Sequence, residues 1–348
     1  MPDLIDPRRY ETVDLPIFAA EFAHFLPSEI YDIHVHLHVP VYGVPTPEAI
    51  KESWAAEAPG ELSREQLPQV QSLLFPGRQT RSLVFANPSK WVDIEAANAH
   101  VAQAIAADQA DGLLVTRPEW APERVRELLA QGGFLGFKPY PGLVGGRFDE
   151  NVSVDDYLPP AQQALADELG LIVMLHLPRP ERLRDPRNQA EVRRMVEAYP
   201  GLRLIIAHIG RAYTMGFAEP GLQALRDLPV HWDFAMNLNA EVIARALELL
   251  GPERVLYGSD LPVALMRGLR RHEGDAYINY SDGEYTWNTP EKRLPAEIEE
   301  QYTLYLYEEL RAFKQAAVQV GLTPAQVEGV MNGNARALVG QVSNRSER

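Results

Sequence analysis

Eight short apolar runs, separated by segments of helical periodicity, constrain the fold of this 348-residue chain more than any other feature. Each run is rich in β-branched residues, as expected for a strand that is buried on both faces. The segments between the runs carry apolar residues three and four positions apart, which predicts helices. The expected strands lie at residues 29–36, 81–87, 111–117, 133–140, 171–177, 202–208, 230–237 and 254–260.

Strands that alternate with helices predict a parallel sheet with right-handed crossover connections. Eight repeats are enough to close such a sheet, so the predicted fold is an α/β (β/α)8 TIM barrel. An open doubly wound sheet is the alternative. No glycine-rich phosphate-binding loop follows the first run, and polar residues follow many runs instead of gathering at one crevice. Both observations favour the barrel.

The chain is expected to form a single catalytic domain with additions at its ends. Residues 1–29 are predicted to be an N-terminal extension packed on the barrel, residues 30–340 the barrel, and residues 341–348 a flexible tail. One insertion, at 37–80, combines a Pro-rich loop with two expected helices. The other, at 261–295, is rich in Gly, Asp, Tyr and Arg and lacks strong periodicity. Insertions after strands 1 and 8 of a barrel are expected to build the substrate pocket.

Composition narrows the range of partners. The formal net charge of -15 disfavours non-specific binding to nucleic acid or to an anionic membrane surface. No apolar run approaches the roughly 18 residues that span a bilayer, and no secretory signal is recognisable, so a cytoplasmic location is expected. The expected partner is a small-molecule substrate, and assembly into a homo-oligomer is left open. The chain has no cysteine, so a metal would have to be bound by imidazole, carboxylate or a modified lysine.

The sequence DIHVHLH ends the first expected strand with two histidines. His34 and His36 are two positions apart, so their side chains leave the same face of the strand. Two imidazoles in that arrangement can bind one cation. A pair of hydrogen-bonded structural histidines would give the same pattern.

Three more polar residues end later strands. His176 ends the fifth run, His208 the sixth and Asp260 the eighth. All strand ends of a parallel barrel converge on one mouth. Because buried polar groups without partners cost several kcal/mol, their recurrence at equivalent positions favours a shared metal site over packing alone.

This order of residues resembles the amidohydrolase superfamily. The resemblance includes Lys138 at the end of the fourth run, the GSD that precedes Leu261, and the closing segment MNGNARAL. It extends from about residue 30 to about residue 340 and points to the amidohydrolase-2 branch, which includes lactonases, decarboxylases and hydratases. These motifs are specific for the superfamily but not for the reaction.

The resemblance implies that His34, His36, His176 and Asp260 bind a divalent catalytic ion, most often zinc. Asp260 would also act as the general base that takes a proton from water and delivers it to the leaving group. His208 would be either a second metal ligand or a free acid/base.

Lys138 leaves two interpretations open. If it is carboxylated, as in some binuclear relatives, it would bridge two metal ions instead of one. If it is unmodified, it would hold a substrate carboxylate or form an ion pair at the mouth.

Candidate substrate contacts lie at or shortly after the strand ends. The guanidinium fork of arginine suits a substrate carboxylate, although a surface ion pair is the alternative for each arginine. Arg211 is favoured because it is close to His208, and Arg147 because GLVGGRFDE resembles a mobile loop. The full set is Asn87, Arg117, Tyr140, Arg147, Arg179 and Arg211.

The leading functional hypothesis is a metal-dependent hydrolase that acts on a cyclic ester or amide, such as a lactone, or on a related small carboxylated substrate. The alternative is a metal-dependent lyase that decarboxylates or hydrates a carboxylated unsaturated or aromatic acid. A third hypothesis is a barrel that binds a ligand or a partner but catalyses no reaction. Fold alone cannot decide among them, because this scaffold supports many reactions.

Overall fold

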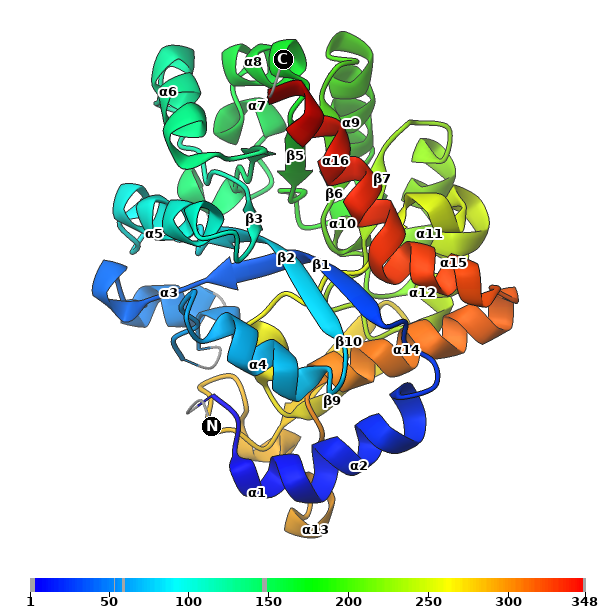
Figure 1. Ribbon diagram of the computed structural model, residues 1–348. Coiled ribbons are helices and arrows are strands. Elements are labelled where there is room, and N and C mark those ends of the chain that lie inside the picture. Colours follow the sequence, from blue (N-terminus) through cyan, green and yellow to red (C-terminus); the bar gives the residue numbers. More distant parts are fainter. Residues whose placement is uncertain (1–3, 53, 58–59, 146–148, 347–348) are drawn as a thin grey trace.

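The computed structural model describes residues 4–52, 54–57, 60–145 and 149–346. Its centre is a set of parallel strands that follow one another in chain order, each beside the next (Figure 1). The eight expected strands are all present, although several are short. They are β1 (Glu29–Leu37), β2 (Gln79–Ala86), β3 (Asp111–Gly112), β4 (Gly136–Phe137), β5 (Ile172–Leu175), β6 (Arg203–Ile206), β7 (His231–Asp233) and β8 (Val255–Leu256).

Two seams join the strands into a closed barrel. Regular pairing gives one sheet of β1 to β3 and another of β4 to β8. A parallel bridge between Leu114 and Phe137 connects β3 to β4. A second parallel bridge, between Val35 and Leu261, connects β1 to the segment after β8. Because the first and last strands pair, the predicted TIM barrel is confirmed and the open sheet is excluded.

Helices surround the strands, and their ends carry the expected caps. The Asp93 side chain accepts a hydrogen bond from the Ala96 backbone at the start of α5 (Ile94–Ala106), and Gly170 ends α8 (Pro160–Leu169) in the left-handed conformation. Every residue of β5 is buried, which explains its uninterrupted apolar sequence. The α-helices between β2 and β8 are α5 (Ile94–Ala106), α6 (Pro122–Gly132), α7 (Val154–Tyr157), α8 (Pro160–Leu169), α9 (Pro186–Ala198), α10 (His208–Arg211), α11 (Met215–Leu225) and α12 (Ala240–Leu250).

The insertion after β1 contains the two predicted α-helices, and the insertion after β8 contains a hairpin that was not predicted. The first insertion includes α3 (Pro47–Glu52) and α4 (Leu67–Leu74). In the second, β9 (Gly268–Glu273) and β10 (Ala276–Ser281) pair antiparallel across a turn at Gly274, whose φ is +58°. The inward face of this hairpin carries polar residues such as Arg270 and Asn279, so the apolar alternation that signals a strand is absent.

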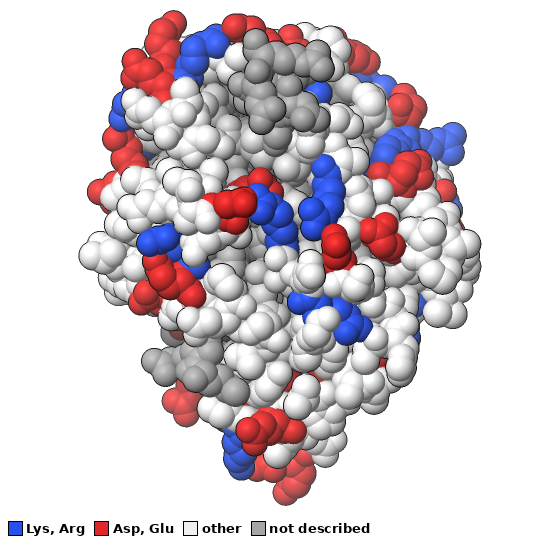
Figure 2. All heavy atoms as spheres, in the orientation of Figure 1, with Lys and Arg blue, Asp and Glu red and all other residues white. Residues whose placement is uncertain are grey.

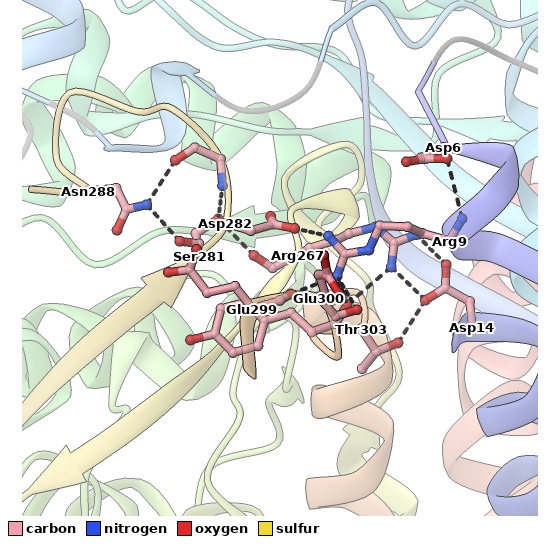
Figure 3. Close-up of polar contacts among 12 residues, drawn as sticks. Asp6, Arg9, Asp14, Arg267, Ser281, Asp282, Asn288, Glu299, Glu300 and Thr303 are labelled. Carbon is pink, nitrogen blue, oxygen red and sulfur yellow. Dashed lines mark hydrogen bonds and ion pairs between the residues drawn. The ribbon is translucent and has the colours of Figure 1, made fainter. Parts of the chain in front are cut away.

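The N-terminal segment forms ion pairs with residues at both ends of the hairpin β9–β10 (Figure 3). A run of helical turns from Pro7 to Phe22 contains α1 (Pro7–Arg9) and α2 (Leu15–Ile17). Asp14, which is fully buried, forms an ion pair with Arg267 just before β9. Arg9 forms an ion pair with Asp282 just after β10. Both ends of the hairpin are therefore tied to the same N-terminal segment.

The C-terminal segment is helical. Tyr307 of α14 (Tyr305–Val320) packs against Phe22, with ring centroids 5.4 Å apart. α15 (Pro324–Glu328) and α16 (Asn334–Ser346) follow. α16 extends into the segment predicted as a tail, and Val342 is buried within the core.

The surface carries charges of both signs. Acidic and basic side chains are interspersed on the face shown in Figure 2. Within the described ranges, no helix has the length and apolar character needed to cross a membrane.

Candidate metal centre at the barrel mouth

β1 and the segment after β8 bring three potential ligands together. His36 Nε2 lies 3.1 Å from Asp260 Oδ1, and His34 Nε2 lies 3.5 Å from the same oxygen. The ligand atoms of these three side chains lie within 4.8 Å of one another. The barrel thus places Asp260 next to His34 and His36, although these residues are far apart in the sequence.

The backbone at the β1–β8 seam is arranged to bring Asp260 this close. The Asp260 N–H donates to the His34 carbonyl oxygen at 2.9 Å, and Asp260 itself has a φ of +60°. A Cβ added to Gly258 would lie 2.7 Å from the His34 Cβ, so this position needs glycine. The buried Asp32 carboxylate accepts hydrogen bonds from the backbones of His34 and Ser259, which joins the two segments again.

His176 and His208 extend the group along the same mouth. Their ring centroids are 5.2 Å apart, and the His208 ring is 4.7 Å from the His34 ring. All these histidines and Asp260 line one cavity of about 530 Å³. His208 belongs to a second group of close ligand atoms, with His34 and Asp233, whereas His176 belongs to neither group.

Asp233, at the end of β7, is a site residue that the sequence interpretation missed. One carboxylate oxygen lies 3.0 Å from His34 Nδ1. The other accepts hydrogen bonds from the backbone N–H groups of His208 and Ala235. A carboxylate can only accept these bonds, so His34 carries its proton on Nδ1 and presents the Nε2 lone pair to Asp260 and the cavity. The one available signal was an aspartate inside the apolar run VHWDFAMN.

His208 is oriented in a similar way. Its Nδ1 lies 2.9 Å from the Ala235 carbonyl oxygen, which can only accept a hydrogen bond. The Nε2 of the neutral ring is therefore left without a proton. Its backbone has a φ of +57°, and the left-handed conformation continues through Ile209, Gly210 and Arg211. This sharp turn directs the end of β6 back toward the cavity.

Burial and neighbouring charges keep these groups in the protonation states that bind metal. Burial and the adjacent Lys138 charge hold the pKa of His34 well below its usual range, and burial lowers the pKa of His208 to about 4. For Asp260, burial acts to raise the pKa, but the hydrogen bond from His36 and the nearby imidazoles lower it overall. At neutral pH His34 and His208 are therefore neutral and Asp260 is ionised, which are the ligand forms of these residues.

Lys138 is buried beneath the same group. Its Nζ lies 3.5 Å from His34 Nε2 and 4.7 Å from the centre of the Phe85 ring. Burial lowers the pKa of Lys138 to about 8. Within the described part of the chain no carboxylate is close enough to form an ion pair with it, so the expectation of a salt-bridged lysine is not met.

Of the six predicted substrate contacts, three line the cavity: Asn87, Tyr140 and Arg211. Arg211 is almost fully buried, and its guanidinium donates to the Leu177 carbonyl oxygen. Arg147 lies outside the described residues.

Arg179 and Arg117 do not line the cavity, which corrects their prediction as substrate contacts. Arg179 is buried and pairs with Glu191 at 2.6 Å, and Arg117 pairs with Glu119 at 2.5 Å nearer the surface. Each charge is satisfied by a neighbouring carboxylate. The cavity is lined instead by residues that the sequence interpretation did not select, among them Lys90, Arg182, Tyr213 and Tyr277.

Solved structures of several proteins have the same fold. A probable 2-pyrone-4,6-dicarboxylic acid hydrolase from Acinetobacter baumannii, with citric acid bound, is 15% identical, with a TM-score of 0.55 over 89% of this chain and 99% of that one. An amidohydrolase from Burkholderia multivorans with bound HEPES is 12% identical, with a TM-score of 0.58 over 89% of this chain and 99% of that one. At these identities the similarity shows the fold.

Sequence comparison gives the family. No curated protein sequence matches this chain significantly. The family model described as Amidohydrolase matches residues 31–341, which extend from within β1 through β8 and include both insertions. The chain therefore belongs to the amidohydrolase family, as its motifs predicted, and is an enzyme of the amidohydrolase superfamily.

Proposed function

We propose that this enzyme is a metal-dependent hydrolase that opens a cyclic ester or amide, with a lactone as the leading substrate type. The observation that carries the proposal is the convergence of His34, His36 and Asp260 at the mouth of one cavity. A 2-pyrone is itself a cyclic ester, so the substrate in the name of the Acinetobacter relative is of the same chemical class.

The donor set fits a divalent ion such as zinc. Two imidazoles and one carboxylate are the ligands of known catalytic zinc sites, which keep a further position open. We assign the ion to His34, His36 and Asp260, with His176 as the fourth ligand implied by the family resemblance. When bound, such an ion supplies Lewis acidity, which polarises a carbonyl oxygen and lowers the pKa of water.

The proton transfers are assigned to Asp260, and the orientation of the water to His208. The lowered pKa of Asp260 keeps its carboxylate ionised and able to take a proton from the attacking water. It then delivers that proton to the leaving oxygen or nitrogen. His208, which is neutral and holds Nδ1 toward Ala235, offers Nε2 as the acceptor that orients the water.

A combined metal and activity measurement tests this proposal. The purified wild type is expected to contain stoichiometric zinc and to release acid from a panel of lactones, including 2-pyrone-4,6-dicarboxylate. A His34→Ala variant is expected to lose both the zinc and the activity. His24→Ala is the matched control, because His24 is exposed on the N-terminal segment and should leave both unchanged.

The same assay separates the alternatives. Release of CO₂ from carboxylated aromatic acids without net hydrolysis would show a lyase instead of a hydrolase. A protein with neither bound metal nor lactone hydrolysis would refute the proposal. Two metal ions per chain, with the second lost in a Lys138→Met variant, would show that Lys138 is carboxylated and bridging.

A further inference from the structure

A second wall of the catalytic cavity is built from cationic and aromatic side chains. Arg182, Tyr213 and Tyr277 line the same cavity as His34 and Asp260. The Arg182 guanidinium carbon lies 5.5 Å from the centre of the Tyr213 ring and 5.6 Å from that of Tyr277. It also lies 5.1 Å from the Phe217 ring, so three aromatic faces surround this cation.

The charge of Arg182 is not neutralised by the protein. No carboxylate within the described ranges forms an ion pair with it; its Nη1 donates to the Arg211 carbonyl oxygen at 3.4 Å. Its Nε is buried and has no hydrogen-bond partner among the described residues. Arg184, two positions later, pairs with Glu181 at 2.5 Å and with Asp275 at 3.0 Å.

An unpaired, half-buried cation is costly for a folded protein to keep. The cost is offset when a ligand supplies the missing anion. Arg182 also has a φ of 55°, an uncommon conformation for a residue other than glycine, and the Asn188 side chain holds its carbonyl at 2.8 Å. The backbone of Arg182 is therefore held in place before any ligand arrives.

The hairpin after β8 completes this wall. Tyr277 of β10 packs edge-on against Tyr213, with ring centroids 5.2 Å apart. Arg270 of β9 lies 4.8 Å from the Tyr213 ring and 4.7 Å from the Tyr277 ring, and it donates to the Met236 carbonyl oxygen at 2.7 Å. The two tyrosines are thus held between Arg270 and Arg182. Of the two arginines, only Arg182 lines the cavity, so its guanidinium is the group of this pair that can contact a ligand.

We infer that Arg182, supported by Tyr213 and Tyr277, determines specificity by binding a carboxylate on the substrate, remote from the bond that reacts at His34, His36 and Asp260. A carboxylate matches the planar fork of a single guanidinium. The inference rests on the proposed function for its reacting bond, and it adds the substrate class: a small molecule with a reactive carbonyl and a separate carboxylate.

A binding experiment tests this wall separately from catalysis. Isothermal titration calorimetry is carried out with isophthalate, a planar dicarboxylate that cannot be hydrolysed, and with isophthalamide, in which neutral amides replace both carboxylates. Arg182→Gln is expected to weaken isophthalate binding about 10-fold or more, because a charge-assisted hydrogen bond is lost. Its effect on isophthalamide should be clearly smaller, because that ligand offers no carboxylate to the guanidinium.

The control variants lie on the same loop. Arg184→Gln removes an arginine that is already paired and should change isophthalate binding less than about 2-fold. Arg182→Lys keeps the charge but not the fork, so its affinity should fall between those of wild type and Arg182→Gln. Thermal unfolding of each variant shows whether it is folded, and Arg182→Lys carries the test if Arg182→Gln does not fold.

Several results would overturn the inference: no binding of isophthalate to the wild type, equal losses in the Arg182 and Arg184 variants, or equal losses for both ligands. The outcome is distinguishable from failure of the hydrolase proposal. If lactone hydrolysis does not change in the Arg182 variants, the carboxylate-binding role of Arg182 is refuted but the hydrolase proposal is not. If isophthalate binding depends on Arg182 but the protein hydrolyses no lactone, the carboxylate-binding role is supported and the hydrolase proposal is refuted.

Discussion

The ability of a histidine at the barrel mouth to bind a metal depends on the hydrogen bond that its other ring nitrogen makes. His34 can offer its Nε2 to an ion only because Asp233 accepts the hydrogen bond at Nδ1, 3.0 Å away. The same carboxylate holds the backbone of His208 through its other oxygen. A carboxylate behind a ligating histidine fixes its tautomer and ring orientation and raises its basicity as a ligand. Asp233 thus supports two members of the site without itself facing the substrate.

Replacement of Asp233 by asparagine should weaken zinc binding. The amide can turn its NH₂ group toward His34 Nδ1, which no longer fixes the tautomer, and a loss of about 10- to 100-fold in affinity is expected. Competition with a chromophoric chelator measures this loss. Asp227→Asn is the control, because Asp227 is exposed and pairs with Arg193 at the surface. Unchanged affinity in Asp233→Asn would contradict the assigned role.

At the scale of secondary-structure elements, the hairpin β9–β10 forms part of the cavity wall and is anchored from outside the barrel. Its inward face carries Arg270 and Tyr277, and its base is held by Asp14 and Arg9 of the N-terminal segment (Figure 3). Asp14 also accepts a hydrogen bond from the Thr303 hydroxyl at 2.9 Å. An element remote in sequence therefore sets the position of the substrate-facing wall.

Removal of the Asp14 side chain should destabilise the protein strongly. Asp14→Ala leaves the buried Arg267 guanidinium without its carboxylate, and breaking such a pair costs about 3–5 kcal/mol. Chemical denaturation measures the free energy of unfolding. The control is Asp155→Ala, whose partner Arg194 is about as exposed as Asp155 itself, so the change should stay below about 1 kcal/mol. Similar losses in both variants would show that the buried ion pair contributes no more to the free energy of unfolding than the exposed one.

At the scale of the whole molecule, closure of the barrel and assembly of the site are the same event. The seam between β1 and β8 brings Asp260 to His34 and His36 and also joins the first strand to the last. The unfolded chain has no preformed site, so an ion that binds there stabilises the fold by linkage.

Removal of the metal is therefore expected to lower the thermal stability. Zinc at about 100 times its Kd should stabilise the folded state by about 2.7 kcal/mol, and chelation should remove this gain. Differential scanning calorimetry of the wild type with zinc and with chelator measures the shift in Tm. In His34→Ala the shift should be absent. An equal shift in that variant would place the ion elsewhere.

The sequence by itself determined the eight strands, the barrel class and the convergence of His34, His36 and Asp260. These follow from local periodicity and from the rule that parallel strands end at one mouth, so they need no knowledge of particular contacts. The family resemblance came from the same residues.

Only the tertiary structure decided which polar residues support or surround the site. Asp233 and Arg182 resemble ordinary charged residues in the sequence, and Arg179 was predicted as a substrate contact although Glu191 neutralises it. The hairpin β9–β10 carries no apolar alternation, because its inner face packs through arginine and tyrosine. Whether a charge is paired depends on partners from distant segments. That pairing is fixed only when the chain has folded, which is why local sequence patterns could not distinguish Arg182 from Arg179.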